Sequence, residues 1–109
     1  MHADVASDQV LNRLKEELHK LYGPRLERAL LYGSRARGDH TAESDYDVLV
    51  VLEPPFDRWA ETWRLADVST RIALETRGAS ILSLRPASPA DLEERTGFMH
   101  NVRREARAI

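Results

Sequence analysis

The feature that most constrains the fold is an unbroken apolar run over residues 48–52, which reads Val-Leu-Val-Val-Leu. A strand with one face in water alternates polar and apolar residues, whereas a continuous apolar run is typical of a strand covered on both faces. Acidic residues precede the run, and Glu53-Pro54-Pro55 ends it. The pattern predicts a central strand over residues 45–52 within a layered α/β or α+β domain.

Periodicity and turn residues place the other elements on both sides of this strand. In chain order we expect a helix between Ser7-Asp8 and Gly23-Pro24, a strand over 28–32, a helical turn over 34–38 with Ser34 as its N-cap, a polar loop over 39–44, a helix over 57–77 ended by Gly78, a strand over 79–85, a short helix from Ser88-Pro89 to about Thr96 and a weaker helical pattern over 98–109.

The long helix over 57–77 is expected to turn one particular stripe toward the core. The stripe recurs at three- and four-residue steps, which suits an amphipathic helix. Its members are Trp59, Trp63, Ala66, Thr70 and Ala73. The two tryptophans stand one helical turn apart and are interpreted as core anchors.

Length and composition fit one domain over residues 1–109. The chain has 16 basic and 18 acidic residues and a net charge of −2, which does not favour a long nucleic acid as partner. It has no cysteine, which excludes disulfides, thiolate zinc sites and cysteine nucleophiles. The N-terminus lacks a signal-peptide pattern and no apolar run approaches the roughly 20 residues that span a bilayer, so we expect a cytoplasmic protein.

Asp45 and Asp47 stand one residue apart at the start of the predicted central strand. Successive strand side chains point to opposite faces, so the two carboxylates are expected on one face, roughly 6 to 7 Å apart along the backbone, with Tyr46 turned away. Magnesium prefers oxygen ligands and is commonly held by one or two carboxylates, with waters and substrate phosphates completing its shell. The pair is therefore a candidate metal site.

Gly33-Ser34, which a spacer over residues 35–44 separates from Asp45, is a candidate phosphate-binding turn. Glycine lets the backbone approach a ligand closely, the N–H groups that follow face outward, and the Ser34 hydroxyl adds a donor. Arg35 and Arg37 offer forked, permanently charged donors that suit phosphate oxygens, although arginines on a polar turn are often merely solvated. All four residues are therefore candidates for nucleotide binding.

Together these residues resemble a minimal nucleotidyltransferase of the DNA polymerase beta-like superfamily. That family is marked by Gly-Ser, a spacer and Asp-x-Asp on the next strand, and Gly33-Ser34 with Asp45 and Asp47 match the pattern in order and spacing. The joint motif is far more specific than either half. The resemblance implies a nucleotidyltransferase fold, in which a small mixed β-sheet is flanked by helices.

The resemblance also implies an activity. Asp45 and Asp47 would be the catalytic acids that hold one or two Mg²⁺ ions, and Ser34 would contact the triphosphate of ATP. Stand-alone members resemble the antitoxin half of a toxin–antitoxin module, in which AMP is transferred to a tyrosine of a helical HEPN-family toxin. The expected partner is therefore a HEPN-type helical protein, and homo-oligomerisation is left open.

One position departs from the family pattern. Active members present a third carboxylate from a later strand, but the matching segment, 79–85, contains no acid. Ser80 and Ser83 lack the charge and basicity of a carboxylate. The alternative hypothesis is therefore a catalytically weak or inactive module that neutralises its partner, or binds nucleotide, by binding alone. Transfer to a small molecule such as an aminoglycoside is a third alternative.

Overall fold

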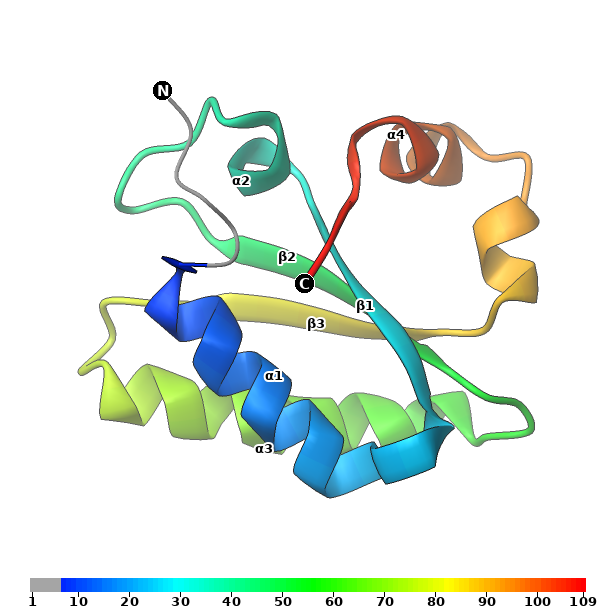
Figure 1. The fold of residues 1–109 in the computed structure, drawn as a ribbon, viewed down its shortest axis with the longest axis horizontal. Helices are drawn as coiled ribbons and strands as arrows, with labels where there is room; N and C mark the ends of the chain where they lie inside the picture. Colours follow the sequence, from blue (N-terminus) through cyan, green and yellow to red (C-terminus); the bar gives the residue numbers. More distant parts are fainter. Residues whose placement is uncertain (1–6) are drawn as a thin grey trace.

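The fold is built on a four-stranded mixed sheet with the order β3-β2-β1-β4 (Figure 1). The computed structural model describes residues 7–109. Its strands are β1 (Leu26–Tyr32), β2 (Tyr46–Leu52), β3 (Leu82–Ala87) and β4 (Arg107–Ala108). β2 runs antiparallel to β1 and parallel to β3, and β4 runs antiparallel to β1. The predicted mixed sheet with β2 in its interior is confirmed.

Helices cover both faces of the sheet (Figure 1). The helical elements are α1 (Gln9–Tyr22), η2 (Gly23–Arg25), α2 (Ser34–Arg37), α3 (Arg58–Glu75), η3 (Ala90–Glu93) and α4 (Gly97–Glu105). α1 and α3 pack on one face against Val48, Val50 and Leu52. η3 and α4 pack on the other face against Leu49 and Val51. The apolar run is thus buried on both sides, as its composition predicts.

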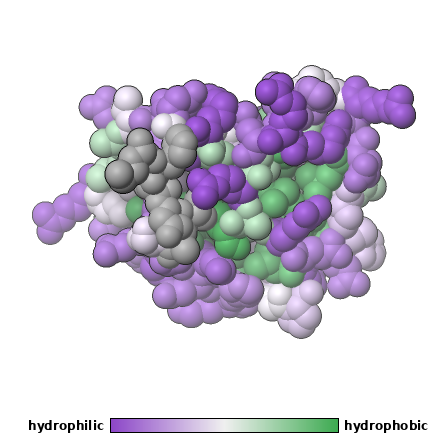
Figure 2. Space-filling view, turned by 45° about the horizontal axis from the view of Figure 1, so that its top comes forward, coloured by the Kyte–Doolittle hydropathy of each residue, from purple (hydrophilic) through white to green (hydrophobic). Residues whose placement is uncertain are grey.

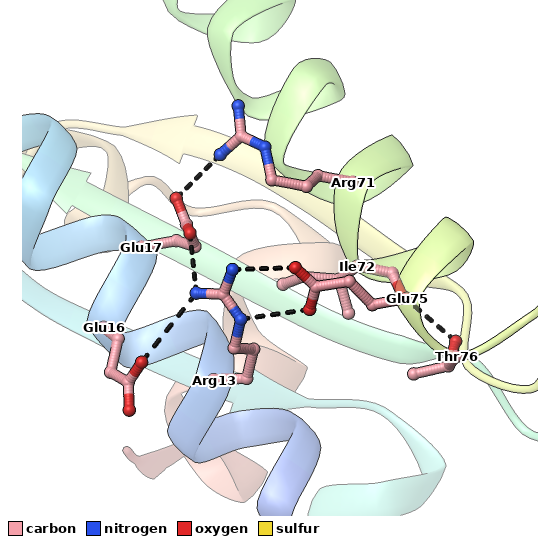
Figure 3. Close-up of polar contacts among 7 residues, drawn as sticks. All are labelled: Arg13, Glu16, Glu17, Arg71, Ile72, Glu75 and Thr76. Atoms are coloured by element: carbon pink, nitrogen blue, oxygen red, sulfur yellow. Dashed lines mark hydrogen bonds and ion pairs between the residues drawn. The ribbon is translucent and has the colours of Figure 1, made fainter.

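An ion-pair network joins α1 to α3 on the surface of the first layer (Figure 3). Arg13 Nη1 lies 2.6 Å from Glu17 Oε1, and Arg13 also donates to both carboxylate oxygens of Glu75, at 3.0 and 2.8 Å. Arg71 Nη1 donates to the second oxygen of Glu17 at 2.7 Å. The network thus links Arg13 and Glu17 of α1 to Arg71 and Glu75 of α3.

The core-facing stripe predicted for α3 is wrong. Trp59 and Trp63 are 69% and 59% exposed and meet edge to face on the outer surface, with ring centres 5.7 Å apart. The buried face instead carries Glu61, Leu65, Val68 and Ile72. This stripe has the same helical period, and its aliphatic side chains fill the space over β2 and β3. Glu61 is accommodated because Arg64 and Arg25 donate to its carboxylate at 2.7 and 3.2 Å.

Several element boundaries differ from the prediction, and the short helix expected from Ser88-Pro89 to about Thr96 is a 3₁₀ turn over Ala90–Glu93. Gly33, not Ser34, is the N-cap of α2, and Ser34 is the first helical residue. The third strand begins at Leu82, three residues later than expected, because Arg77 and Gly78 both take positive φ and the chain turns before it extends. The C-terminal helix ends at Glu105, and the residues after it pair with β1. Within the described residues, no helix is long and apolar enough to cross a membrane.

Candidate functional site

The turn between β1 and α2 accepts only glycine at position 33. Gly33 has φ +78°, and a Cβ built on it would lie 2.6 Å from Asp47 Oδ2. A side chain at this position would meet both backbone strain and the carboxylate. The β1–β2 register, which pairs Tyr32 with Asp47, creates this proximity. The structure therefore brings the first half of the motif directly against Asp47.

Asp47 lies on the sheet face opposite to that of Tyr46. The Tyr46 ring is buried in the α1/α3 layer, and its hydroxyl donates to Asp8 Oδ2 at 2.8 Å. Asp47 is partly buried, whereas Asp45, just ahead of the strand, is exposed. Burial, and then the charge of Asp45, raises the pKa of Asp47, while Arg85 acts in the opposite direction. The two carboxylates are thus close enough to repel each other electrostatically, and a bound cation would reduce this repulsion.

Ser34 and Arg37 lie in the turn that faces Asp47. The Ser34 hydroxyl makes no hydrogen bond to any part of residues 7–109. Arg37 donates to Asp39 Oδ2 at 3.2 Å and pairs with Glu105 at 3.3 Å, and its charge is felt by Asp47. Ser34 thus follows the residue that lies against Asp47, and Arg37 is near enough for its charge to lower the pKa of Asp47.

Arg35 is held differently. Its guanidinium lies over the Tyr46 ring, 3.9 Å from the ring centre. Its Nε donates to the carbonyl of Ser44 at 2.9 Å, and its Nη2 reaches the carbonyls of Thr41 and Ala42. These contacts tie the polar loop to β2, so in this structure Arg35 organises the spacer of the motif.

Two groups near the site were not singled out from the sequence. Glu105 accepts from the backbone N–H of Gly33 at 3.1 Å, although it follows Gly33 by 72 residues. Arg85 on β3 influences the pKa of Asp47 and packs its guanidinium on Phe98, 5.1 Å from the ring centre. Neither contact has a local sequence signal, because both arise from the way α4 folds back over the sheet.

A cavity of about 530 Å³ opens beside Arg85 on the same face of the sheet as Asp47. Its walls come from β2, β3, η3, the start of α3 and the start of α4, with Leu49, Phe98 and Met99 supplying apolar surface. Figure 2, with the side of α2 and α4 tilted toward the reader, shows an apolar area among hydrophilic residues on the visible face. The cavity shares Arg85 with the surroundings of Asp47, but neither aspartate nor the Gly33-Ser34 turn lines it.

The donor set suits a hard cation. Asp45 and Asp47 present only carboxylate oxygens, the ligand type that Mg²⁺ prefers. On β3 the residue aligned with Asp47 is Ser83, and no group of three or more His, Asp or Glu side chains in residues 7–109 is arranged to hold a metal. Two acids beside a turn of phosphate dimensions fit an ion whose remaining ligands come from water and a triphosphate.

A mixed sheet that holds an aspartate pair against a Gly-Ser turn defines a nucleotidyltransferase-type domain. The family model for the nucleotidyltransferase domain matches residues 11–99, and the chain belongs to this family. The resemblance drawn from Gly33-Ser34, Asp45 and Asp47 is thereby confirmed.

Two candidate protein adenylyltransferases of Methanocaldococcus jannaschii are similar in sequence. MJ0604 is 40% identical over 57 residues, which are 52% of this chain and 53% of that protein. MJ0141 is 28% identical over 67 residues, which are 62% of this chain and 67% of that protein. The matched part of the chain thus spans about half the length of the first relative.

Solved structures share the fold at low sequence identity. A candidate nucleotidyltransferase from Sulfolobus solfataricus superimposes with a TM-score of 0.59 at 20% identity, covering 92% of this chain and 76% of that one. The toxin–antitoxin MntA-HpeT gives a TM-score of 0.56 at 21% identity, covering 90% and 70%. A toxin–antitoxin structure with AMP-PNP gives 0.53 at 23% identity, covering 90% and 72%.

Proposed function

We propose that this chain is a Mg²⁺-dependent nucleotidyltransferase that transfers an adenylyl group from ATP to a partner protein. The proposed acceptor is a tyrosine of a HEPN-type toxin in the cytoplasm, and the chain is the antitoxin of that pair. The observation that carries the proposal is the contact of Gly33 with Asp47, which joins the phosphate turn to the acidic pair. Likeness to the candidate protein adenylyltransferase MJ0604 supports a protein as acceptor.

The proposed reaction is the transfer of AMP from ATP to a hydroxyl group of the acceptor. The acceptor hydroxyl attacks the α-phosphorus of ATP, a new oxygen–phosphorus bond forms, the bond to the bridging oxygen breaks, pyrophosphate leaves and the hydroxyl proton passes to water. Ser34 and Arg37 hold the leaving phosphates, and Asp45 and Asp47 would hold the Mg²⁺ ion. Bound Mg²⁺ would neutralise charge that develops on the phosphate oxygens.

A labelling experiment tests this function. The chain, Mg²⁺ and ATP labelled at the α-phosphorus are incubated with the protein encoded by the adjacent gene, and label on a tyrosine of that protein is expected. Asp45→Asn/Asp47→Asn should lose the label, whereas Asp67→Asn, at an exposed position on α3, should keep it. Equal absence of label with the parent and the double variant would remove the enzymatic claim.

A second candidate function is neutralisation of the partner by binding alone. The observation that favours it is Ser83, which stands beside Asp47 where the family pattern has a third acid, together with the nearby Arg85 charge. Toxin neutralisation that persists in Asp45→Asn/Asp47→Asn would support this function. Loss of neutralisation while the two proteins still co-purify would support adenylyl transfer instead.

A further inference from the structure

A carboxylate of this chain occupies two donors of the candidate phosphate-binding turn, the backbone N–H of Gly33 and the guanidinium group of Arg37. The backbone N–H of Gly33 donates to Glu105 Oε1 at 3.1 Å. Arg37 Nη1 lies 3.4 Å from Oε1 and 3.3 Å from Oε2 of the same side chain. Backbone N–H groups and guanidinium groups bind carboxylate and phosphate oxygens with the same geometry. The Glu105 carboxylate therefore occupies a site whose donors suit an anion such as phosphate.

The C-terminal segment holds Glu105 there from both sides. At the start of α4, Phe98 packs edge to face on Tyr32, with ring centres 5.5 Å apart. After Glu105, β4 pairs Arg107 with Leu31 of β1. The Glu105 side chain is 19% exposed, so water competes weakly for its oxygens. Because the carboxylate is tethered on both sides, its effective concentration at Gly33 is high.

We propose that Glu105 is an internal competitor for the nucleotide, whose phosphates must displace its carboxylate from Gly33 and Arg37. The inference rests on the proposed function, because it uses the same turn and the same Arg37. Two anions cannot share one N–H and one guanidinium group without strong repulsion. Nucleotide binding is thereby coupled to release of the Glu105 side chain and of the end of α4.

Calorimetric titration with inorganic triphosphate, and separately with Mg²⁺-ATP, tests the competition. Glu105→Gln keeps the shape of the side chain and removes its charge, and we expect it to bind each ligand about tenfold more tightly than the parent, which corresponds to about 1.4 kcal/mol. The matched control is Glu53→Gln, which makes the same change of charge at an exposed position after β2 and should leave both affinities unchanged. In the unmodified chain, the Glu105 carboxyl carbon resonance should move when triphosphate is added, and that of Glu53 should not.

The outcomes separate the competition from the transferase activity. Equal or weaker binding by Glu105→Gln, with binding by the parent intact, overturns the competition and leaves the proposed function standing. Tighter binding without label on any partner protein supports the competition and counts against transfer. Absence of triphosphate binding in the parent and in Glu105→Gln overturns both, because no phosphate cradle would then exist.

Discussion

Asp47 Oδ2 lies 2.6 Å from the point that a Cβ on Gly33 would occupy. The two residues are separated by the whole spacer of the motif, and the antiparallel pairing of β1 with β2 brings them together. The glycine of this family motif thus has a local physical cause, because the acidic side chain takes the volume that any other residue would need. A change in the conformation of the turn at Gly33 would consequently also displace the Asp47 carboxylate.

Gly33→Ala is therefore expected to damage the site more than the fold. The alanine methyl would push the Asp47 carboxylate away, and the backbone at φ +78° and ψ −159° lies in a region essentially confined to glycine, which adds on the order of 1–3 kcal/mol of strain. The control is Gly78→Ala, which has nearly the same φ, +79°, but nothing within 4 Å of the added Cβ. Both variants should lose thermal stability because of the positive φ, and only Gly33→Ala should lose Mg²⁺-ATP binding in calorimetry. Loss of binding in both would mean that backbone strain alone governs the site.

The ionisation of Asp47 should oppose folding in the absence of a cation. Burial and the charge of Asp45 raise its pKa in the folded chain above the ordinary value. A raised carboxyl pKa means that the contribution to stability is present below the unfolded pKa and is lost as the pH rises through the folded pKa. Asp47→Asn should therefore have a higher Tm than the parent at pH 7, with the difference disappearing in acid.

Cation binding should show the opposite pH dependence. Mg²⁺ needs the ionised carboxylate, so affinity should begin to fall at a higher pH than an unperturbed aspartate would give. Calorimetric titration of the parent between pH 4 and pH 7 measures this fall. A Tm for Asp47→Asn below that of the parent at pH 7 would contradict the raised pKa of Asp47.

Substitutions on the two faces of α3 should separate its buried stripe from its exposed one. Leu65 is fully buried, and Leu65→Ala should cost about 2–5 kcal/mol because a cavity is left in the core. Trp63→Ala removes a larger side chain but mainly its contact with Trp59, so the cost should be less than about 1.5 kcal/mol. Urea unfolding of both variants measures the difference. A larger loss for Trp63→Ala than for Leu65→Ala would contradict the burial described here.

The same helix marks the limit of what sequence patterns predict. Two apolar stripes with helical period run along α3, and periodicity alone does not say which one meets the sheet. The tryptophans have more apolar surface, yet Leu65, Val68 and Ile72 have shapes that pack over neighbouring strands. Glu61 places a charged residue on the buried stripe, and one of the partners that accommodate it, Arg25, comes from η2, far along the chain.

At the site, the sequence pattern predicted those residues that lie close together along the chain. The turn and the aspartates lie within one strand–turn–strand unit, whereas the register of β1 and β2 that brings Gly33 against Asp47 was not predicted. Glu105 and Arg85 reach the site through α4 and β3, and their contacts depend on tertiary packing. The roles of the site residues in binding and catalysis stay predictions that the experiments above address.

Removal of Arg35 should mainly lower the stability of the fold, whereas removal of Arg37 should mainly lower the affinity for triphosphate. Arg35 lies over the ring of Tyr46 and donates to the Ser44 carbonyl, so Arg35→Ala should loosen the spacer and cost about 1–3 kcal/mol of stability. Arg37 makes only partly exposed ion pairs, so Arg37→Ala should cost less than about 1 kcal/mol. Its loss should nevertheless weaken inorganic triphosphate binding roughly tenfold or more, since a charged donor to the phosphate is removed. Thermal unfolding and calorimetry on the two variants measure both quantities. A weakened affinity in Arg35→Ala at unchanged Tm would instead identify Arg35 as the phosphate ligand and Arg37 as a surface residue.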